Sequence, residues 1–456
     1  MTDNLLKISK FFLYLAPFSV AIVSQSTLFP FIVGKYVFFR TVIDLALVFF
    51  VWAWATGKIT NYKLQITNLW RQPLAIAVSI FIFIFILAGF FGVNPSASFW
   101  SNFERGEGVF QLIHLFIFFI LLALLFTDKK SWRRMFVVMI LAAVLVIAYG
   151  LAGALHIGNF VGSNLCARFA GSLGNPAYTG TFLIFAIFYA AYLAVEDWKI
   201  AKKWFWPGSA VLFFIFLFLS QTRGAVLGLG IGILAFLTYL FFTLSNKKHR
   251  WLVFAIAIFL IILGIFGIKY RQSIDLMPFC RAQGGGNRIL DVNFGTETFQ
   301  TRLLLWQESF KAFQERPILG WGPENFTVAF EKYYKPQFTT WYDRAHNIFF
   351  DYLVMTGILG LLSFIGIFIA YYWQLFKTVN SKRQLATGNQ KLTSIPITNY
   401  PVAKQLPKGS LLITKALMFA LPISYLIQGL VLFDVLPIYI NLFLFLAFAN
   451  WKLNNE

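Results

Sequence analysis

The chain has 456 residues, of which 59% are hydrophobic and only 12% are charged, with a mean hydropathy of +0.71. Because an ordinary soluble domain is about 45–50% apolar and about 25% charged, this composition excludes that class. The net charge of +20 would suggest nucleic acid in a soluble protein, but most of it lies in short loops between apolar segments, where it sets membrane topology. The chain has no nucleic-acid recognition motif, so we expect no nucleic-acid partner.

Apolar runs of about 20 residues recur along the chain, which predicts an all-α polytopic membrane protein. Twelve transmembrane helices are predicted, at residues 11–33, 36–55, 73–92, 109–127, 133–155, 177–195, 207–221, 224–244, 251–269, 347–374, 411–431 and 435–451. The first follows a charged start without a convincing cleavage site, so we interpret it as uncleaved. Segment 1–269 thus holds helices one to nine, segment 270–346 forms one large loop, and segment 347–456 holds the last three.

Lysine and arginine are distributed unequally between the two sets of loops. If the N-terminus is cytoplasmic, the short outer loops hold only Lys35, Arg105, Arg168 and Arg223, while the cytoplasmic segments hold most of the others. The positive-inside rule therefore predicts that both termini are cytoplasmic and that the large loop is extracytoplasmic. The polar, basic and proline-containing segment 377–410 is interpreted as a flexible cytoplasmic linker.

Both cysteines, Cys166 and Cys280, fall outside the membrane on the extracytoplasmic side under this topology. In an oxidising compartment they could form a disulfide between two loops, or they could remain free thiols. The sequence supplies no distance between them, so both alternatives stay open.

The large loop contains one clear amphipathic helix, predicted at about residues 298–315. Its apolar residues recur at spacings of three and four; they are Phe299, Leu303, Trp306, Phe310 and Phe313. Arg316-Pro317 ends the helix. We expect this helix to lie on the outer membrane surface or to cap the helix bundle. The aromatic stretch that follows suits sugar rings, but the membrane interface is the favoured interpretation of it.

Only two of the four histidines, His156 and His346, can face an extracytoplasmic site. His346 is the stronger candidate, because Arg344 and Asn347 flank it and it stands at the entrance of a predicted helix. An imidazole with an ordinary pKa near 6.5 suits a general base. No second ligand at metal-binding spacing accompanies it, so no metal site is predicted.

Three arginines on the outer side favour an anion site. Arg223 interrupts an apolar stretch, where it either reaches water through a short turn or binds an anion at the outer leaflet. Arg168 lies in another outer loop, and Arg302 stands near the start of the amphipathic helix. Because arginine binds phosphate in a bidentate fork, a lipid pyrophosphate is the guest we expect for these residues together with His346.

Four short motifs occur in a fixed order between Ser220 and His346. They are Ser220-Gln221-Thr222-Arg223-Gly224, Thr301-Arg302 with Trp306 downstream, Arg316-Pro317-Ile318-Leu319-Gly320-Trp321-Gly322, and His346-Asn347. In this order, with the large outer loop, the chain resembles the O-antigen ligase/O-antigen polymerase family of bacterial membrane glycosyltransferases. The segment 377–410 is longer than that family would lead us to expect.

The resemblance implies a GT-C-like helical enzyme of the bacterial inner membrane. It implies that the donor is a glycan on undecaprenyl pyrophosphate, and that the acceptor is a glycan, a lipid-linked molecule or a protein. Arg223 and Arg302 would bind the pyrophosphate and His346 would assist the acceptor hydroxyl, with Arg168 and Asp434 as further substrate-binding residues. The transfer would invert the anomeric configuration, without a metal or other cofactor, on the extracytoplasmic face.

Two other functions stay open. A polysaccharide or lipid-linked sugar transporter is suggested by the number of spans and by the intramembrane acids Asp44, Asp351 and Asp434, which could relay protons. Against it, no pair of broken helices recurs in two matching halves. A small-anion carrier, such as one for bicarbonate, is the other alternative. Within the family, the sequence does not separate a ligase from a polymerase or a protein-directed transferase.

Overall fold

The computed structural model describes residues 2–56, 66–102, 104–160, 165, 168–197, 204–270, 297–338, 340–386 and 408–455. Helices and loops make up all of this part of the chain, which confirms the all-α fold class. The helices are α1 (Thr2–Leu15), η1 (Ala16–Ala21), α2 (Val33–Ala55), α4 (Pro73–Phe90), α5 (Pro95–Trp100), α6 (Val109–Leu125), α7 (Lys129–Ala154), η2 (Gly171–Leu173), α8 (Pro176–Glu196), α9 (Phe205–Leu219), α10 (Arg223–Thr243), α11 (Lys247–Lys269), α12 (Glu297–Glu315), α13 (Phe326–Lys332), α14 (Ile348–Ala386), α15 (Lys408–Gly429) and α16 (Leu436–Asn455). Cys166, Cys280 and most of the polar linker lie outside the described residues, so the disulfide stays an open prediction.

Within the described residues, nine helices are long and apolar enough to cross a membrane. Two shorter apolar helices, α6 and α9, coincide with further predicted spans. The chain is therefore an integral membrane protein, while the total of twelve spans stays a prediction. The predicted first span, 11–33, is not one helix, because α1 ends at Leu15 and gives way to the 3₁₀ helix η1, which has Pro17 in its first turn. Proline fixes φ and lacks the N–H that would continue an α-helix ladder.

Local sequence explains where several of these helices begin. Asp128 accepts a hydrogen bond from the backbone N–H of Ser131 and caps α7, and Asn175 accepts one from Ala177 and caps α8. Pro73, Pro95 and Pro176 occupy the first turns of α4, α5 and α8, where the missing N–H costs nothing. Capping residues and proline therefore fix the starts of helices whose apolar composition alone would leave them undefined.

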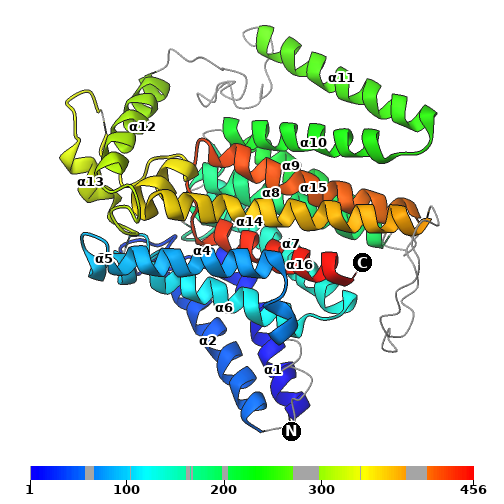
Figure 1. The fold of residues 1–456 in the computed structure, drawn as a ribbon. Coiled ribbons are helices and arrows are strands. Elements are labelled where there is room, and N and C mark those ends of the chain that lie inside the picture. The colour runs from blue at the N-terminus through cyan, green and yellow to red at the C-terminus, as the bar shows by residue number, and fades with distance from the viewer. Residues whose placement is uncertain are drawn as a thin grey trace.

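The core of the bundle is built around α16, which crosses the centre of Figure 1 in red. Of the residues in its most apolar stretch, 94% are buried. Aromatic rings from three helices pack together at the C-terminal half of α16. Phe136 of α7 stacks on Tyr189 of α8 at 4.7 Å and meets Phe448 of α16 edge to face at 4.9 Å. In contrast, α11 has no buried residue and runs apart from the bundle beyond α10.

The described part of the large loop, residues 297–346, gathers at one end of the bundle together with α5 (Figure 1). It has its own small core, formed by Leu305, Ala312, Trp321, Phe326, Ala329, Phe330, Phe338 and Ala345 together with Val354 and Met355 of α14. The predicted amphipathic helix is α12, which packs on α13 and α14. It therefore covers the end of the bundle, and the described residues of 297–346 are called the cap below.

The face that α12 buries is only partly the one marked by its largest apolar residues, of which Phe299, Leu303, Trp306 and Phe313 are half-buried. Leu305, Ser309 and Ala312 are buried, whereas Phe310 is 47% exposed. Small residues at positions 309 and 312 let α12 approach α13 closely, and the bulkier Phe310 is left on the outside. Hydrophobic periodicity located this helix, but the packing partner selected its inner face.

The motif at residues 316–322 is a clasp between the loop and α14. The N–H of Trp321 donates to the carbonyl of Val354 at 2.8 Å, and the N–H of Ile358 donates to the carbonyl of Pro317 at 2.8 Å. These bonds form where α14 is kinked at Gly357, whose φ is +65°. A Cβ at Gly357 would lie 2.3 Å from the carbonyl oxygen of Ile318, so only glycine fits there. The clasp fixes the loop on the bundle.

Candidate functional site

A short loop, residues 101–108 between α5 and α6, lies beneath the cap. Arg40 of α2 donates to the carbonyl of Gly106 at 2.6 Å, and Ser101 donates its hydroxyl hydrogen to Glu324 at 2.5 Å. The backbone N–H of Arg105 donates to the Asn102 side chain at 2.8 Å. These bonds hold the loop from both sides and direct Arg105 and Glu107 inward.

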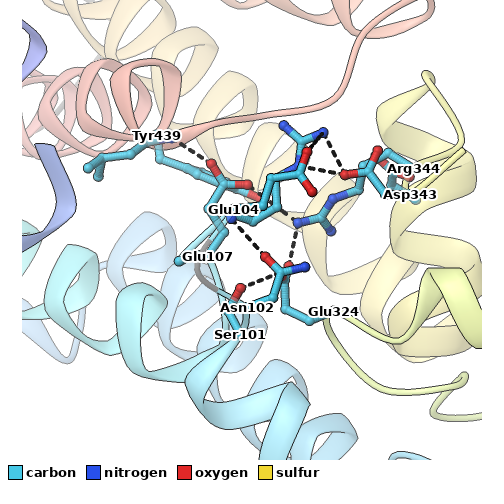
Figure 2. A network of polar contacts seen from close by, with 12 residues as sticks. Ser101, Asn102, Glu104, Glu107, Glu324, Asp343, Arg344 and Tyr439 are labelled. Atoms are coloured by element: carbon cyan, nitrogen blue, oxygen red, sulfur yellow. Dashed lines mark hydrogen bonds and ion pairs between the residues drawn. The ribbon is translucent and has the colours of Figure 1, made fainter. Parts of the chain in front are cut away.

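Arg344 is the centre of the buried polar network that Figure 2 shows. It is 5% exposed, donates to Glu324 and lies 3.4 Å from a carboxylate oxygen of Glu107. Burial lowers the pKa of Arg344, but the carboxylates of Glu324 and Glu107 outweigh it, so its pKa is raised and it stays charged. A buried guanidinium between two acids joins the cap to the 101–108 loop.

Glu107 links this network to the core helix. One of its oxygens accepts a hydrogen bond from the backbone N–H of Leu436, the first residue of α16, at 3.1 Å. Burial raises the pKa of Glu107 to about 8, against the opposing effect of Arg344. The carboxyl group therefore sits where the protonated form is favoured near neutral pH.

A second arginine, Arg105, connects the cap to α8. It pairs with Asp343 at 2.5 Å and donates to the hydroxyl of Tyr178 at 3.2 Å. The guanidinium groups of Arg105 and Arg344 both lie over the ring of Phe433, at 5.1 and 5.8 Å from its centre. Phe433 belongs to the α15–α16 connection, so this connection contacts both the 101–108 loop and the large loop through one ring.

His346 stands against the same ring. Its imidazole lies 5.1 Å from Phe433 and 5.5 Å from Tyr342, and its backbone φ is +50°. Burial, together with the positive charge of Arg302, lowers the pKa of His346 to about 4, so the ring is neutral at physiological pH. Its buried Nδ1 has no hydrogen-bond partner among the described residues. The ring can therefore accept a proton.

The structure brings Arg302 and His346 together, because the charge of Arg302 acts directly on the imidazole. Trp306, one turn further along α12, donates its indole N–H to the carbonyl of Ala345 at 3.0 Å, next to His346. This bond fixes the start of α12 relative to the histidine. The predicted pairing of these two motifs is thus found in the fold.

Arg168 and Arg223 lie together at the turn between α9 and α10. Phe169, adjacent to Arg168, donates its N–H to the carbonyl of Leu219 at 2.9 Å, at the end of α9. Arg223 is the first residue of α10 and is half-buried. The two arginines therefore flank the same turn between α9 and α10, while the contacts of His346 in the described part of the chain are with other residues.

Asp434 follows directly after Phe433, but its side chain is directed into the bundle. It accepts a hydrogen bond from the hydroxyl of Tyr425 at 2.5 Å and is 7% exposed. Burial raises the pKa of Asp434 to about 7. This hydrogen bond joins Asp434 to α15, nine residues earlier in the chain.

Sequence reasoning did not identify Arg105, Glu107 and Glu324 as site residues. The available signal was composition, because only 18 of 456 residues are acidic, and the side chains of two of them, Glu107 and Glu324, are 5–6% exposed. A carboxylate buried in such a chain needs a cationic partner. Among the described residues, no group of three or more His, Cys, Asp or Glu side chains could hold a metal ion.

Comparison with known families covers the central part of this site. Residues 208–365 match the family model for O-antigen ligases, a region that contains Arg223, Arg302 and His346. No curated protein matches the chain. The family indicates a membrane enzyme that acts on glycans. The match confirms the resemblance drawn from the four motifs and assigns residues 208–365 of this chain to the O-antigen ligase family.

Proposed function

We propose that this protein transfers a glycan from undecaprenyl pyrophosphate to an acceptor hydroxyl on the extracytoplasmic face of the bacterial inner membrane. The observation that carries this proposal is the pair of His346 and Arg302, a neutral buried imidazole with an open Nδ1 beside a cation. The imidazole of His346 can accept a proton while the guanidinium of Arg302 binds a phosphate. The acceptor is a glycan, a lipid-linked molecule or a protein.

The proposed reaction is a single displacement. The acceptor oxygen attacks the anomeric carbon, the bond from that carbon to the pyrophosphate oxygen breaks, and the acceptor proton passes to His346. Because attack and departure are on opposite faces, the anomeric configuration inverts. Arg302 and Arg223, with Arg168 beside the same turn, stabilise the charge on the departing pyrophosphate, the role that a metal has in other transferases. Asp434 acts on the substrate only through Phe433 and its local fold.

Donor binding also prepares the base. Burial first, and the positive charge of Arg302 second, lower the pKa of His346 to about 4, which makes a weak base. A pyrophosphate between the two groups would neutralise the arginine and remove its part of this lowering, while the effect of burial would remain. His346 would thus be a stronger proton acceptor when the donor is bound than when it is absent.

The test is glycan transfer by the purified protein in detergent from a lipid-linked donor. We expect His346→Ala to bind the donor as wild type does and to lose about 10²–10⁴-fold in turnover. Arg302→Gln should instead lose donor affinity. His156→Ala and Arg316→Gln are the controls, since both residues are exposed at the outer end. Wild-type turnover in His346→Ala would remove His346 from the scheme.

A sugar transporter is the second candidate, and the same assay separates it, because transport needs two compartments and transfer does not. The three acids that favoured proton relay have local partners. Asp44 lies 3.1 Å from His114, and Asp351 accepts a hydrogen bond from the N–H of Ala345 at 2.7 Å. Asp434 is bonded to Tyr425. These contacts favour structural roles for the acids. No observation favours a small-anion carrier.

A further inference from the structure

A pocket of about 240 Å³ opens beside the polar network on the side away from α12. Its walls come from the starts of α2, α8 and α16 and from the 101–108 loop. The polar and aromatic residues that line it are Lys35, Tyr36, Arg105, Glu107, Asn175 and Tyr178. The volume is below the roughly 300 Å³ at which pockets for drug-sized ligands begin, so it suits one small unit of a larger molecule.

Lys35 is the unusual member of this pocket. Its side chain is 2% exposed, and its ammonium donates to the backbone carbonyls of Ile22 and of Ser172, the latter at 2.9 Å. An ammonium has three hydrogens, so one donor is left for a ligand. In the part of the chain that the structure describes, no carboxylate forms an ion pair with Lys35. A buried cation without an acid is costly unless another anion meets it.

The remaining charges around the pocket are already matched. Arg105 pairs with Asp343, and Glu107 lies against Arg344. Asn175, the N-cap of α8, and Leu436, the first residue of α16, both line the cavity, so the positive ends of two helix dipoles lie beside it. Lys35 and these two helix ends therefore leave the pocket with an excess of positive potential.

The other walls are suited to a sugar ring. Tyr36, Tyr178 and Phe31 supply aromatic surface, and Asn175 and Arg105 supply hydrogen-bonding groups. Tyr178 also contacts Phe433, at 5.9 Å between ring centres, and Phe433 contacts His346. One ring thus separates the pocket from the proposed base.

We propose that this pocket binds an acidic sugar unit of the acceptor glycan, with Lys35 meeting its carboxylate or phosphate. The assignment to the acceptor rests on the proposed glycan transfer. The acceptor is chosen over the donor because the walls of the pocket include neither α10 nor α12, the helices that carry Arg223 and Arg302. The donor pyrophosphate and the acidic unit would therefore be held by different helices, with His346 between them.

The experiment measures binding of small probes to the full-length protein in nanodiscs of neutral lipid. The probes are methyl glucuronide, glucose 6-phosphate, the uncharged methyl glucoside, and glycerol phosphate as a lipid headgroup. In wild type we expect at least one acidic sugar to bind about tenfold or more tightly than the glucoside, as a charge-assisted hydrogen bond would give. The sugar that binds decides between carboxylate and phosphate.

Two variants test the role of the pocket. Lys35→Met removes the ammonium but keeps the length of the side chain, and it should abolish the preference for acidic sugar. Asn175→Asp keeps an N-cap for α8 and places a carboxylate in the pocket, so it should weaken acidic sugars by a similar factor even if Lys35→Met folds poorly. Lys332→Met, an exposed lysine of the cap, is the control and should change nothing.

Equal affinity for acidic and uncharged sugars in wild type would overturn the proposal, and so would tight binding of glycerol phosphate alone, which indicates a lipid headgroup site. Failure of the proposed function has a different signature. If purified protein transfers no glycan but Asn175→Asp still removes acidic-sugar binding, the pocket stands and the transfer fails. If transfer proceeds without any preference for acidic probes, the transfer stands and the pocket fails.

Discussion

Charged residues cluster at both ends of the bundle, and the two clusters differ in access to water. At one end Arg133 pairs with Asp197 at 2.7 Å and is 40% exposed, and Lys129 pairs with Glu196 while 45% exposed. At the other end Arg344, Glu107 and Glu324 have side chains only 5–6% exposed. The first cluster fastens helices while Arg133 and Lys129 reach solvent; its third cation, Lys452 at 3.9 Å from Glu196, is buried. The second holds its charges in the dry interior, next to His346 and the Lys35 pocket.

The two clusters therefore have different roles. A buried charge must be matched within the protein, so the cluster of Arg344, Glu107 and Glu324 fixes the mutual positions of the cap, the 101–108 loop and α16. A partly exposed cation is also solvated, so its loss is tolerated. Substitutions at the two ends should therefore differ in their cost to stability.

Arg344→Met should be the most destabilising of these changes. It leaves the carboxylate of Glu324 buried without its cation and removes the hydrogen-bond partner of Glu107, which costs about 3–5 kcal/mol of the free energy of unfolding. The measurement is unfolding of the purified protein in detergent. Arg316→Met, an exposed arginine over Trp321, is the matched control and should lose no more than about 1 kcal/mol. Equal losses in the two variants would contradict the distinction between the clusters.

Gly357→Ala should loosen the clasp between the loop and α14. An alanine there meets both a positive φ and the carbonyl oxygen of Ile318 at 2.3 Å, a strain of about 1–3 kcal/mol. Gly366→Ala in the same helix is the control, because nothing lies within 4 Å of its added Cβ, and it should be neutral or stabilising. Thermal unfolding compares the two, and protease cleavage within the cap should rise only in Gly357→Ala.

Glu107→Gln should change how stability depends on pH. The folded-state pKa of Glu107 is raised from 4.5 to about 8 by burial. Its contribution to stability is therefore fully present below pH 4.5 and is lost as pH rises through about 8. Between these values the melting temperature of wild type should fall more than that of Glu107→Gln. Glu331→Gln, at an exposed position of the cap, should behave as wild type does.

Arg133→Gln at the other end should have the smallest effect. The pair with Asp197 is part-exposed, and Trp206 still donates its indole N–H to Asp197 at 2.9 Å in the variant. We expect a loss of about 0.2–1 kcal/mol, reduced further at high salt. Unfolding at low and high ionic strength measures both quantities. A loss as large as that of Arg344→Met would show that the two clusters are equivalent.

The sequence predicted the parts of the structure that depend on local pattern. Apolar runs located most of the membrane helices, periodicity placed α12 within a residue of its observed start, and the predicted topology allowed Arg302 and His346 to converge on one side. The prediction was wrong at residues 11–33, because a window average does not register the proline that ends α1 and begins η1. The apolar stripe of α12 was only partly its buried face, since Phe310 is exposed while Trp306 stacks on Phe350 of α14.

Composition and hydrophobic periodicity were enough to predict the membrane character of this protein and the position of α12, because both patterns are local. Which charges are buried together follows from the three-dimensional packing. Arg105, Glu107 and Glu324 are remote in sequence from Arg344 and His346, and no spacing rule connects them. Because a buried charge without a partner is costly, each of these charged groups pairs with an opposite charge, and which one it meets depends on how the whole chain packs.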